Sequence, residues 1–488
     1  MTQDNSSINQ FIKNKKVLLV GLGILGGGTA TALWLLKHKA QLTITDLKSK
    51  KDLKPSLKKL KKYSSKIKFV LGRHLQKDFL DNELIIVNPA ISTLNPHSAV
   101  AQYLRKAKKH NKIIENDISL FFKFVTNPII GITGTKGKTT TTNWICHLLK
   151  GKYPQTFIGG NIPDSPVLSF FNKITKNSPV VLELSCFELE LLENQVPHLA
   201  FITNLYQDHL NRYQTMKKYA QVKANIFLHQ KPDDYLILNY DNSWTKYFLS
   251  LKPISQVYFI SQKKLPKKLN GVLQDGSKIY FQENGKKFFV FNAVSFLKTW
   301  GQHNLENLLR AILAAKLFGL NIEQIKKQII TLPQIKMRQE IIFQNDHLTI
   351  INDSASTSPE AAIAALNRWA KNKNLIIITG GTDKNLKFNE LAKEIKKAIL
   401  PENLVVLNGS ASKKLIKELE KIKYSNNYFV FESLEECFHY SLYLRKQGKK
   451  NIILFSPAAT SFEKFKNEFD RGEQFNKLSL LINSTGSS

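Results

Sequence analysis

The sequence has only three cysteines, Cys146, Cys186 and Cys437, and they form neither a CxxC pair nor a histidine-containing cluster at metal-ligand spacing. Their scarcity argues against a disulfide framework and against a zinc site. No run of eighteen consecutive apolar residues occurs, so the sequence predicts no membrane-spanning helix. The first residues also lack the apolar segment of a signal peptide. We therefore expect a cytoplasmic protein without membrane insertion.

Acidic residues are few relative to basic ones: 38 Asp and Glu stand against 71 Lys and Arg, a formal net charge of +33. Such an excess can indicate binding to nucleic acid or to an anionic membrane. Arginine, the usual reader of bases, is sparse, and no aromatic-interleaved RNA motif occurs. The densest basic run, residues 48–68, carries Leu53, Leu57 and Leu60 at a spacing that predicts an amphipathic helix with its lysines in water. We therefore expect no specific nucleic-acid partner.

Apolar strands that run into polar or glycine-rich loops and then into helices occur in three successive blocks. The first block reads "KVLLV", "GLGILGGG", a helical segment and "QLTITD", a βαβ unit that indicates a parallel sheet. The pattern restarts at "NPIIGITGTKGKTTTTNWICHLLK" and again at "LTIINDSASTSPEAAIAALNRWA". With 488 residues and 42% hydrophobic content, the chain can form several cores. We predict three α/β domains over residues 1–116, 117–334 and 335–488.

The segment "GITGTKGKTTTT", Gly131 to Thr142, follows an apolar strand and opens a helix. Its glycines let backbone N–H groups face a phosphate, and the helix N-terminus adds the positive end of its dipole. Lys138 can reach β- and γ-phosphate oxygens, and Thr139 offers a hydroxyl to Mg²⁺. The general P-loop pattern has four residues between its first glycine and Gly-Lys-Thr, and this segment departs from it by one residue when counted from Gly131. A flexible glycine loop does not explain a Gly-Lys-Thr that opens a helix after a strand, so we predict phosphate binding.

The N-terminal turn "GLGILG", with Asp46 at the end of the next strand, matches the dinucleotide fingerprint. Taken alone, this turn is compatible with a nicotinamide-dependent oxidoreductase. Both a nicotinamide dinucleotide and a UDP-linked substrate would place a diphosphate over the glycine turn. Asp46 and Asn88, each directly after a strand, could complete such a pocket.

Several other polar residues follow predicted strands or open predicted helices, where ligands of parallel sheets bind. Glu183 ends the apolar strand "PVVLEL", the usual place for a carboxylate that holds Mg²⁺ beside a phosphate loop, although an N-cap or an ion pair is the alternative. His209 lies in a polar loop beside Asp208, and a lone loop histidine is usually not a metal ligand. Lys223 could be one more solvated lysine of a lysine-rich chain.

A later helix begins near His303, Asn304 and Asn307, and its leucines and isoleucines predict a face that packs on a core. Asn304 and Asn307 are one helical turn apart, so both can face one pocket. Asp353 ends the strand "LTIIND", where its carboxylate can accept a ribose hydroxyl.

The loop "GITGTKGKTT" resembles the ATP loop of the Mur ligases, which add amino acids to the peptidoglycan precursor. Further similar segments follow in family order along nearly the whole chain: "GGNIP" (159–163), "LELSCFELE" (182–190), "TNLYQDHLNRY" (203–213), "YAQVKANIF" (219–227), "GQHNLENLLRAILAA", "INDSASTSPEAA", "ITGGTDK" and "FSPAATSFEKFKNEFDRGEQF". The last four are most similar to the branch that adds D-glutamate. Sister branches usually have a Tyr/His-bearing motif where this chain has "NDSAST".

The resemblance implies an α/β fold in which N- and C-terminal Rossmann-like parallel sheets surround a central P-loop-type ATPase domain. It implies an ATP-dependent ligase that adds D-glutamate to UDP-N-acetylmuramoyl-L-alanine through an acyl phosphate. ATP and Mg²⁺ are the implied cofactors, and we expect a monomer. A Mur-type or folylpolyglutamate-type ligase with another acceptor stays an alternative, as does a nicotinamide-dependent oxidoreductase.

The resemblance also implies roles for individual residues. The implied catalytic residues are Lys138, Glu183, His209 and Lys223. The implied metal ligands are Thr139, Glu183, His209 and a carbamylated Lys223. The implied ATP contacts are Gly134, Thr135, Lys136, Gly137, Lys138, Thr139, Thr140, Asn304, Asn307, Arg338 and Asp353. The implied UDP-precursor contacts are Gly23, Ile24, Leu25, Asp46, Asn88, Asn161 and Ser185. The implied D-glutamate contacts are Thr357, Lys384, Ser461 and Phe462.

Carbamylation requires a neutral amine that captures CO₂, so we expect the surroundings of Lys223 to lower its pKa by burial near metal cations.

This chain departs from the family pattern at several positions. Ala355 stands where the family usually has lysine, and Lys336 is a nearby lysine that could compensate. Met337 stands where the family usually has a histidine before the arginine that corresponds to Arg338. Glu188 stands where glutamine is common. The segment "NEFDRG" permutes the usual order of its aromatic and acidic residues.

Overall fold

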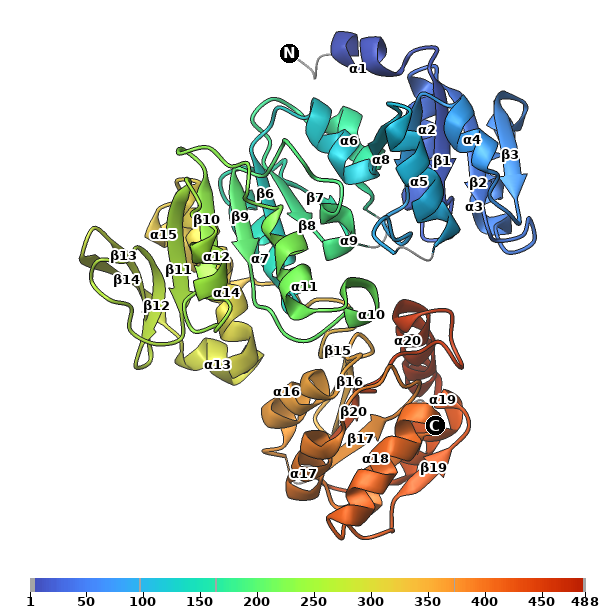
Figure 1. Ribbon diagram of the computed structural model, residues 1–488. Coiled ribbons are helices and arrows are strands. Elements are labelled where there is room, and N and C mark those ends of the chain that lie inside the picture. Colours follow the sequence, from blue (N-terminus) through green and yellow to red (C-terminus); the bar gives the residue numbers. More distant parts are fainter. Residues whose placement is uncertain (1–4, 96–97, 163–164, 373, 486–488) are drawn as a thin grey trace. The chain divides into compact units, whose positions relative to one another are not determined.

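The computed structural model describes residues 5–95, 98–162, 165–372 and 374–485, so Pro163 of the "GGNIP" segment lies outside the described residues. The chain forms two compact units. One unit comprises the chain up to Ser295 together with Asn304–Leu332, and the other comprises Phe296–His303 together with the chain from Pro333 onward. Three sheets with flanking helices confirm the predicted three-domain α/β fold (Figure 1). The boundaries at residues 116 and 334 stay predictions.

The first sheet is entirely parallel, with the strand order β3-β2-β1-β4-β5. Its strands are β1 Lys16–Val20, β2 Gln41–Asp46, β3 Ile67–Leu71, β4 Leu84–Val87 and β5 Ile113–Glu115. The accompanying helices are α1 Asn5–Ile12, α2 Gly27–Lys37, α3 Lys54–Leu60, η1 Lys61–Lys66, α4 Gln76–Asp81, α5 Ala99–Lys109 and α6 Asp117–Phe124. The "GLGILG" turn joins β1 to α2, as predicted. The basic run forms α3 and η1, with Leu53 and Leu60 buried beneath its lysines.

The central sheet has nine strands in the order β14-β13-β12-β11-β10-β9-β6-β8-β7. The parallel strands are β6 Ile129–Thr133, β7 Phe157–Gly160, β8 Val180–Glu183, β9 Leu199–Ile202, β10 Tyr235–Asn239, β11 Gln256–Ser261 and β12 Gly271–Asp275. Two antiparallel strands, β13 Lys278–Glu283 and β14 Lys286–Asn292, extend the edge. Strand β6, which leads into the phosphate loop, therefore lies inside the sheet between β8 and β9.

Helices of the central region pack on both faces of this sheet (Figure 1). The helices of the central region are α7 Lys138–Lys150, α8 Val167–Phe170, η2 Phe171–Lys173, α9 Cys186–Leu189, α10 Leu210–Tyr213, α11 Met216–Ala224, α12 Thr245–Ser250, α14 Leu305–Leu317 and α15 Ile322–Ile330. Of these, α8 packs against α2 and α6, and α10 packs against α11. Helix α13 Val294–Trp300 and the short η3 Gln302–Asn304 include the segment Phe296–His303, which belongs to the second unit although the residues before and after it belong to the first. Helix α14 packs against α7, and its leucines and isoleucines up to Leu313 are fully buried, as predicted, whereas Leu317 is partly buried.

The third sheet has the order β15-β16-β20-β17-β18-β19, in which only β15 runs antiparallel to its neighbour. Its strands are β15 Glu340–Gln344, β16 Leu348–Asn352, β17 Leu375–Thr379, β18 Leu404–Leu407, β19 Phe429–Phe431 and β20 Asn451–Phe455. Its helices are α16 Pro359–Trp369, α17 Asn389–Ala398, η4 Pro401–Asn403, α18 Ser410–Lys421, α19 Leu434–Tyr443 and α20 Glu468–Thr485. Since β20 lies between β16 and β17, the loops that follow these three strands share one edge of the sheet.

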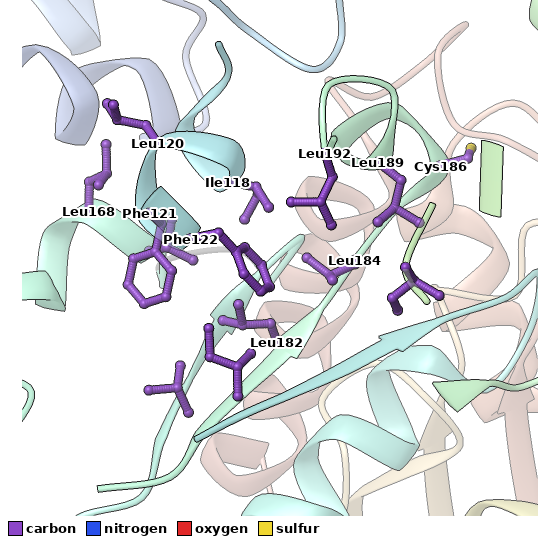
Figure 2. Close-up of a cluster of buried hydrophobic side chains, with 14 of the residues drawn as sticks. Ile118, Leu120, Phe121, Phe122, Leu168, Leu182, Leu184, Cys186, Leu189 and Leu192 are labelled. Carbon is purple, nitrogen blue, oxygen red and sulfur yellow. The ribbon is translucent and has the colours of Figure 1, made fainter. Parts of the chain in front are cut away.

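The first two sheets share one apolar core. Helix α6, which follows the first sheet, buries Ile118, Phe121 and Phe122 in the same cluster as Leu182 of β8 and Leu184 just beyond it (Figure 2). Burial of apolar surface is the main favourable term in such packing. The shared core therefore fixes the glycine turn of the first sheet within the same unit as the phosphate loop.

No helix in the described ranges is both long and apolar enough to span a bilayer.

Candidate functional site

The predicted phosphate loop joins β6 to α7, as the sequence pattern indicated. Gly134 and Gly137 have φ values of 140° and 81°, which side chains rarely adopt, and Gly137 is the N-cap of α7. A Cβ on Gly134 would overlap Thr203, and one on Gly137 would lie 2.5 Å from Asn307 Oδ1. Glycine is therefore required at both positions by conformation and by space.

Neighbouring polar groups hold the phosphate loop in place. Lys136 N donates to Asn204 Oδ1 at 2.8 Å, and Thr203 Oγ1 donates to the Lys136 carbonyl at 2.7 Å. The Lys138 ammonium folds back over the loop and donates to the carbonyl oxygens of Gly134 and Thr135, both at 3.2 Å. Backbone and cation are thus arranged around one small segment, the arrangement expected of an anion site.

Glu183 is the last residue of β8, which pairs directly with β6. Its Oε1 accepts a hydrogen bond from Asn161 Nδ2 at 3.0 Å. Its Oε2 is buried and has no hydrogen-bond partner among the described residues. A buried carboxylate oxygen without a partner is costly, and a bound cation would satisfy it.

Lys223 of α11 is only 1% exposed, so its interpretation as a solvated lysine is wrong. Its ammonium donates to the Gly134 carbonyl at 2.9 Å and to Thr133 Oγ1 at 3.3 Å, which places it against the phosphate loop. Burial lowers the pKa of Lys223 to about 7, and the nearby Lys138 adds to the lowering. The direction of this shift is the one that carbamylation requires.

His209 is the N-cap of α10 and adopts a left-handed conformation, with φ of 55°. Its Nε2 lies 3.7 Å from Asp208 Oδ2. The imidazole contacts the ring of Tyr219 at 6.1 Å between centroids, and the Lys223 ammonium lies 4.7 Å from the centre of the same ring. The structure therefore brings His209 and Lys223 to one neighbourhood.

Asn304 and Asn307 meet at the start of α14, where Asn307 Nδ2 donates to Asn304 Oδ1 at 2.9 Å. Asn307 Oδ1 accepts from Thr141 Oγ1 of the phosphate-loop helix at 3.1 Å. Arg310 was not predicted as a functional residue; its buried guanidinium donates to Asn307 Oδ1 at 3.3 Å and to the Thr203 carbonyl at 2.6 Å. The signal was present: one arginine interrupts an otherwise apolar helix face.

His303, which the sequence grouped with Asn304 and Asn307, belongs to the second unit. Its Nε2 lies 3.2 Å from Gln339 Nε2. Burial lowers the pKa of His303 to about 4, with the nearby Arg368 adding to the effect. The histidine is therefore neutral at physiological pH.

The glycine turn of the first sheet is closed by Asp46 and Asn88, the two residues that the sequence placed beside it. Asp46 Oδ2 accepts from Gly23 N at 3.0 Å, and its Oδ1 accepts from Lys48 N at 2.8 Å. Asn88 Nδ2 donates to the Gly21 carbonyl at 3.2 Å. Between these anchors, the side chains of Ile24 and Leu25 are exposed.

Asn161 and Ser185, the other predicted precursor contacts, lie beside Glu183 in the central region. Asn161 N donates to the Glu183 carbonyl at 2.8 Å. Ser185 caps α9 in a capping box with Glu188, which stands in the place of the usual glutamine. Burial raises the pKa of Glu188 to about 8, and the neighbouring Asp117 contributes to the rise. A protonated Glu188 has the neutral charge of glutamine.

In the second unit, Asp353 directly follows β16 and is buried. Its Oδ1 accepts from Gln339 N at 3.0 Å, and its Oδ2 accepts from Ser456 Oγ at 2.8 Å. Burial raises the pKa of Asp353 to about 7. Arg338 is exposed between two residues with positive φ, Met337 and Gln339.

The four predicted D-glutamate contacts lie on loops along one edge of the third sheet. Thr357 precedes α16, Lys384 follows β17, and Ser461 and Phe462 follow β20. Backbone hydrogen bonds between Thr382 and Thr460 join the loop of Lys384 to that of Ser461. Ser461 is buried, whereas Lys384 and Phe462 are exposed.

Arg471, which lies in the "NEFDRG" segment and was likewise not predicted, is fully buried. Its guanidinium donates to Ser354 Oγ at 3.1 Å and to the Ser354 carbonyl at 2.7 Å. It also donates to the carbonyls of Ala459 and Thr460 at 3.0 and 3.1 Å. Arg471 therefore fixes the loop after β16 to the loop after β20.

Within the described ranges, no group of three or more His, Cys, Asp and Glu side chains is arranged to hold a metal ion. Any cation near Glu183 would need other ligands, such as the Thr139 hydroxyl, a modified lysine or phosphate oxygens.

Comparison with known proteins identifies the family to which the chain belongs. The Mur ligase middle domain matches residues 132–315, and the Mur ligase MurD-like N-terminal domain matches residues 15–109. The chain belongs to the Mur ligase family, which confirms the resemblance found in the motifs. Within this family it is 38% identical over 469 residues to the UDP-N-acetylmuramoylalanine–D-glutamate ligase of Borreliella afzelii (strain PKo), covering 96% of this chain and 98% of that protein.

Solved structures support the same fold. The UDP-N-acetylmuramate-alanine ligase MurC of Thermotoga maritima has a TM-score of 0.61 and 20% identity, covering 96% of this chain and 100% of that one. The MurF ligase of Thermotoga maritima, solved in complex with ADP, has a TM-score of 0.56 and 14% identity, covering 96% and 95%. At this level of identity the likeness concerns the fold alone.

Proposed function

We propose that this chain is an ATP-dependent ligase that joins D-glutamate to UDP-N-acetylmuramoyl-L-alanine during synthesis of the peptidoglycan precursor. Its membership of the Mur ligase family and its similarity over nearly full length to a ligase with that printed activity support the proposal. The observation that carries it is the placement of Lys138, Glu183 and Lys223 around a single phosphate loop.

ATP is proposed to place its phosphates on the loop Gly134–Thr140, where the backbone N–H groups and the Lys138 ammonium offer donors. Asn304 and Asn307 flank this loop, where Asn307 Oδ1 accepts a hydrogen bond from Thr141 Oγ1 and Asn307 Nδ2 donates to Asn304 Oδ1. Arg338 and Asp353 are assigned to the nucleotide by family resemblance, and that assignment stays a prediction. Binding of an ATP analogue to Arg338→Ala and Asp353→Asn, measured by calorimetry, tests it.

Mg²⁺ fits the residues around the loop because Glu183 Oε2 is buried without a hydrogen-bond partner among the described residues. Glu183 and the Thr139 hydroxyl would hold one ion, and His209 with a carbamylated Lys223 would hold a second. The carboxylate, hydroxyl and carbamate oxygens of this set suit Mg²⁺, and His209 would add a nitrogen ligand. When bound, the ions would neutralise negative charge on the phosphoryl group during its transfer.

In the proposed reaction, an oxygen of the alanyl carboxylate attacks the γ-phosphorus of ATP, and the bond to the ADP oxygen breaks. The amine of D-glutamate then attacks the acyl carbon, the carbon–oxygen bond to phosphate breaks, and the amine loses a proton as the amide forms. The Lys138 ammonium compensates charge on the transferring group. The buried surroundings of Lys223 and Glu183 limit hydrolysis of the acyl phosphate by excluding water.

The D-glutamate site is proposed along the shared edge of β16, β17 and β20. The Lys384 ammonium can pair with one carboxylate of the amino acid, and the Thr357 and Ser461 hydroxyls and the Phe462 backbone can bond the other. Ala355 supplies no charge where the family usually has lysine. The candidate replacement is Lys336, which is exposed and close to Arg338 in the sequence. Lys336→Ala should raise the KM for D-glutamate if this replacement operates.

A substrate panel tests the acceptor directly. Purified protein is incubated with ATP, Mg²⁺ and either UDP-N-acetylmuramoyl-L-alanine, a UDP-N-acetylmuramoyl acceptor that lacks alanine, or a folate, each with D-glutamate or an L-amino acid. The proposal requires an amide product, identified by mass, only with UDP-N-acetylmuramoyl-L-alanine and D-glutamate. Product from the folate or from the acceptor without alanine would identify a different ligase.

We further propose cytoplasmic action as a monomer with domains near residues 1–116, 117–334 and 335–488. The three cysteines are free and buried, which suits a reducing compartment. Light scattering tests the oligomeric state, and limited proteolysis followed by mass spectrometry tests the boundaries.

A further inference from the structure

Arg212, a residue that the proposed chemistry does not use, is bonded at every N–H of its guanidinium. Its Nε and Nη2 donate to Glu190 Oε1 and Oε2 at 2.7 and 2.8 Å. The remaining N–H groups donate to the carbonyls of Pro89 and Ala90, at 3.2 and 3.3 Å, and of Ile91 at 3.2 Å. A planar guanidinium with five fixed donors can make this set of bonds, and an ammonium cannot.

Glu190 is the partner of Arg212 and is even more enclosed, with its side chain 1% exposed against 9% for Arg212. Besides the arginine, its carboxylate accepts from Tyr213 OH at 2.8 Å and from Thr93 Oγ1 at 2.7 Å. The guanidinium also stacks over the Phe187 ring at 4.3 Å. The desolvation cost of a buried ion pair is compensated only when further hydrogen bonds satisfy its remaining donors and acceptors, as they do here.

The pair joins three segments that are far apart in the sequence. Thr93 and the three carbonyls belong to the loop that follows β4 and Asn88 in the first sheet. Glu190 is the C-cap of α9, whose N-cap is Ser185. Arg212 lies in α10, whose N-cap is His209.

The same loop reaches the glycine turn of the first sheet. A Cβ built on Gly21 would lie 2.8 Å from Ile91 Cδ1 and 2.9 Å from Asn88 Cβ. The loop therefore contacts the turn on one side and the central region on the other.

We propose that Arg212 and Glu190 are a positioning pair that fixes the loop Pro89–Thr93, and with it the glycine turn, relative to the central phosphate site. This inference rests on the proposed function and on the UDP-precursor contacts that the family resemblance implies at the glycine turn. We assign neither residue a role in the chemical steps. The pair sets the distance that the substrate must span, so its loss should affect the nucleotide-linked substrate and not ATP.

Steady-state kinetics of Arg212→Lys, with each substrate varied in turn, test this inference. The expected result is a precursor KM that rises by about tenfold or more while the ATP KM stays within about twofold, because uniform binding of one substrate is lost. Lys68→Met is the control, since it removes the cation from another buried carboxylate, Asp78, in the first sheet. It should leave both KM values unchanged. A parallel rise of both KM values in Arg212→Lys, or no rise, would overturn the proposal.

A milder substitution keeps the test decisive if Arg212→Lys does not fold. Thr93→Val removes only the hydroxyl bonded to Glu190, whereas Thr93→Ser retains it. The precursor KM should rise several-fold in Thr93→Val and stay near wild type in Thr93→Ser. Equal precursor KM values in these two variants would contradict the pair's role.

A readout without catalysis separates this inference from the proposed function. Amide hydrogen exchange of residues 88–95 in the free protein should accelerate in Arg212→Lys, while exchange in the phosphate loop stays unchanged. If wild-type protein makes no product from the precursor, the proposed function fails, yet the exchange result still decides the pair. Unchanged exchange of residues 88–95 would refute the positioning role whatever the reaction is.

Discussion

The ammonium of Lys223 donates a hydrogen bond to the Gly134 carbonyl at 2.9 Å, from a position that is almost wholly buried beside the phosphate loop. A positively charged side chain at this place would repel a metal ion, whereas a carbamate would bind one. The two states of Lys223 differ in the sign of their charge, and substitutions can distinguish them.

Lys223→Ala should lose most activity, because it vacates the position of the proposed anionic ligand. Acetate should restore part of that activity by occupying the vacated space and supplying the missing charge. Lys223→Arg should be inactive with or without acetate, since a guanidinium fills the space with the wrong charge and cannot capture CO₂. The check is phosphate release over a series of acetate concentrations. Near-native activity of Lys223→Arg would refute carbamylation.

Lys138→Ala should lower turnover by orders of magnitude while the fold is retained. The lost ammonium stabilises charge in the transition state, a contribution of roughly a few kcal/mol. Lys150→Ala, at the exposed far end of the same helix, is the matched control and should be near wild type. Turnover and circular dichroism of both variants provide the check, and normal turnover of a folded Lys138→Ala would exclude the ATP role.

Asp46→Ala should raise the KM for the UDP-linked precursor more than it changes ATP affinity. The carboxylate accepts from the backbone of Gly23 and Lys48, so its loss loosens only the turn of the first sheet. The exposed Asp52 supplies the control, Asp52→Ala. Calorimetry should also detect precursor binding and no NAD binding to the wild type. Tight NAD binding would favour an oxidoreductase.

Glu188→Gln should change the pH dependence of stability. Burial raises the pKa of Glu188 to about 8, so between its ordinary value and pH 8 the folded state holds a proton that the unfolded state has lost. The free energy of unfolding of the wild type should therefore fall as pH rises through this window. Above pH 8 the stabilisation from the retained proton is fully lost.

The glutamine variant cannot ionise and lacks this loss, while its amide oxygen can still accept from Ser185 N, as Glu188 Oε2 does. Melting temperatures of the two proteins should agree near about pH 5, and the variant should be higher near about pH 9. Glu193→Gln, an exposed substitution, should follow the wild type. Parallel curves for wild type and Glu188→Gln would rule out a buried titrating carboxyl.

The positions of the candidate residues at strand ends could be predicted because parallel strands place their carboxyl ends at one edge. Glu183 is the last residue of β8, Asp46 the last of β2, and Asp353 directly follows β16. Local pattern sufficed for these residues because a strand and its following loop are contiguous in sequence. Their chemical roles stay predictions.

The buried charges could not be predicted in the same way. Lys223 lies among other lysines in sequence, and its burial follows from contacts with Gly134, which lies 89 residues earlier in the chain. Arg212 and Arg471 likewise depend on partners in distant segments. Because no local periodicity encodes such pairs, only the folded chain identifies them.

The strands β12, β13 and β14 were also missed, although a signal was present. Asn284 and Gly285 form the two-residue turn between β13 and β14, and both have positive φ. Asn-Gly between alternating residues is a strong hairpin indicator. The charged residues on these strands, such as Lys286 and Lys287, obscured the apolar alternation.

The most direct test of the proposed ligase activity is phosphate release by the purified protein with ATP and Mg²⁺, measured with each substrate omitted in turn. We predict sustained release only when UDP-N-acetylmuramoyl-L-alanine and D-glutamate are both present, with one phosphate per amide formed. Release that is independent of D-glutamate, or that requires a different acceptor, would contradict it.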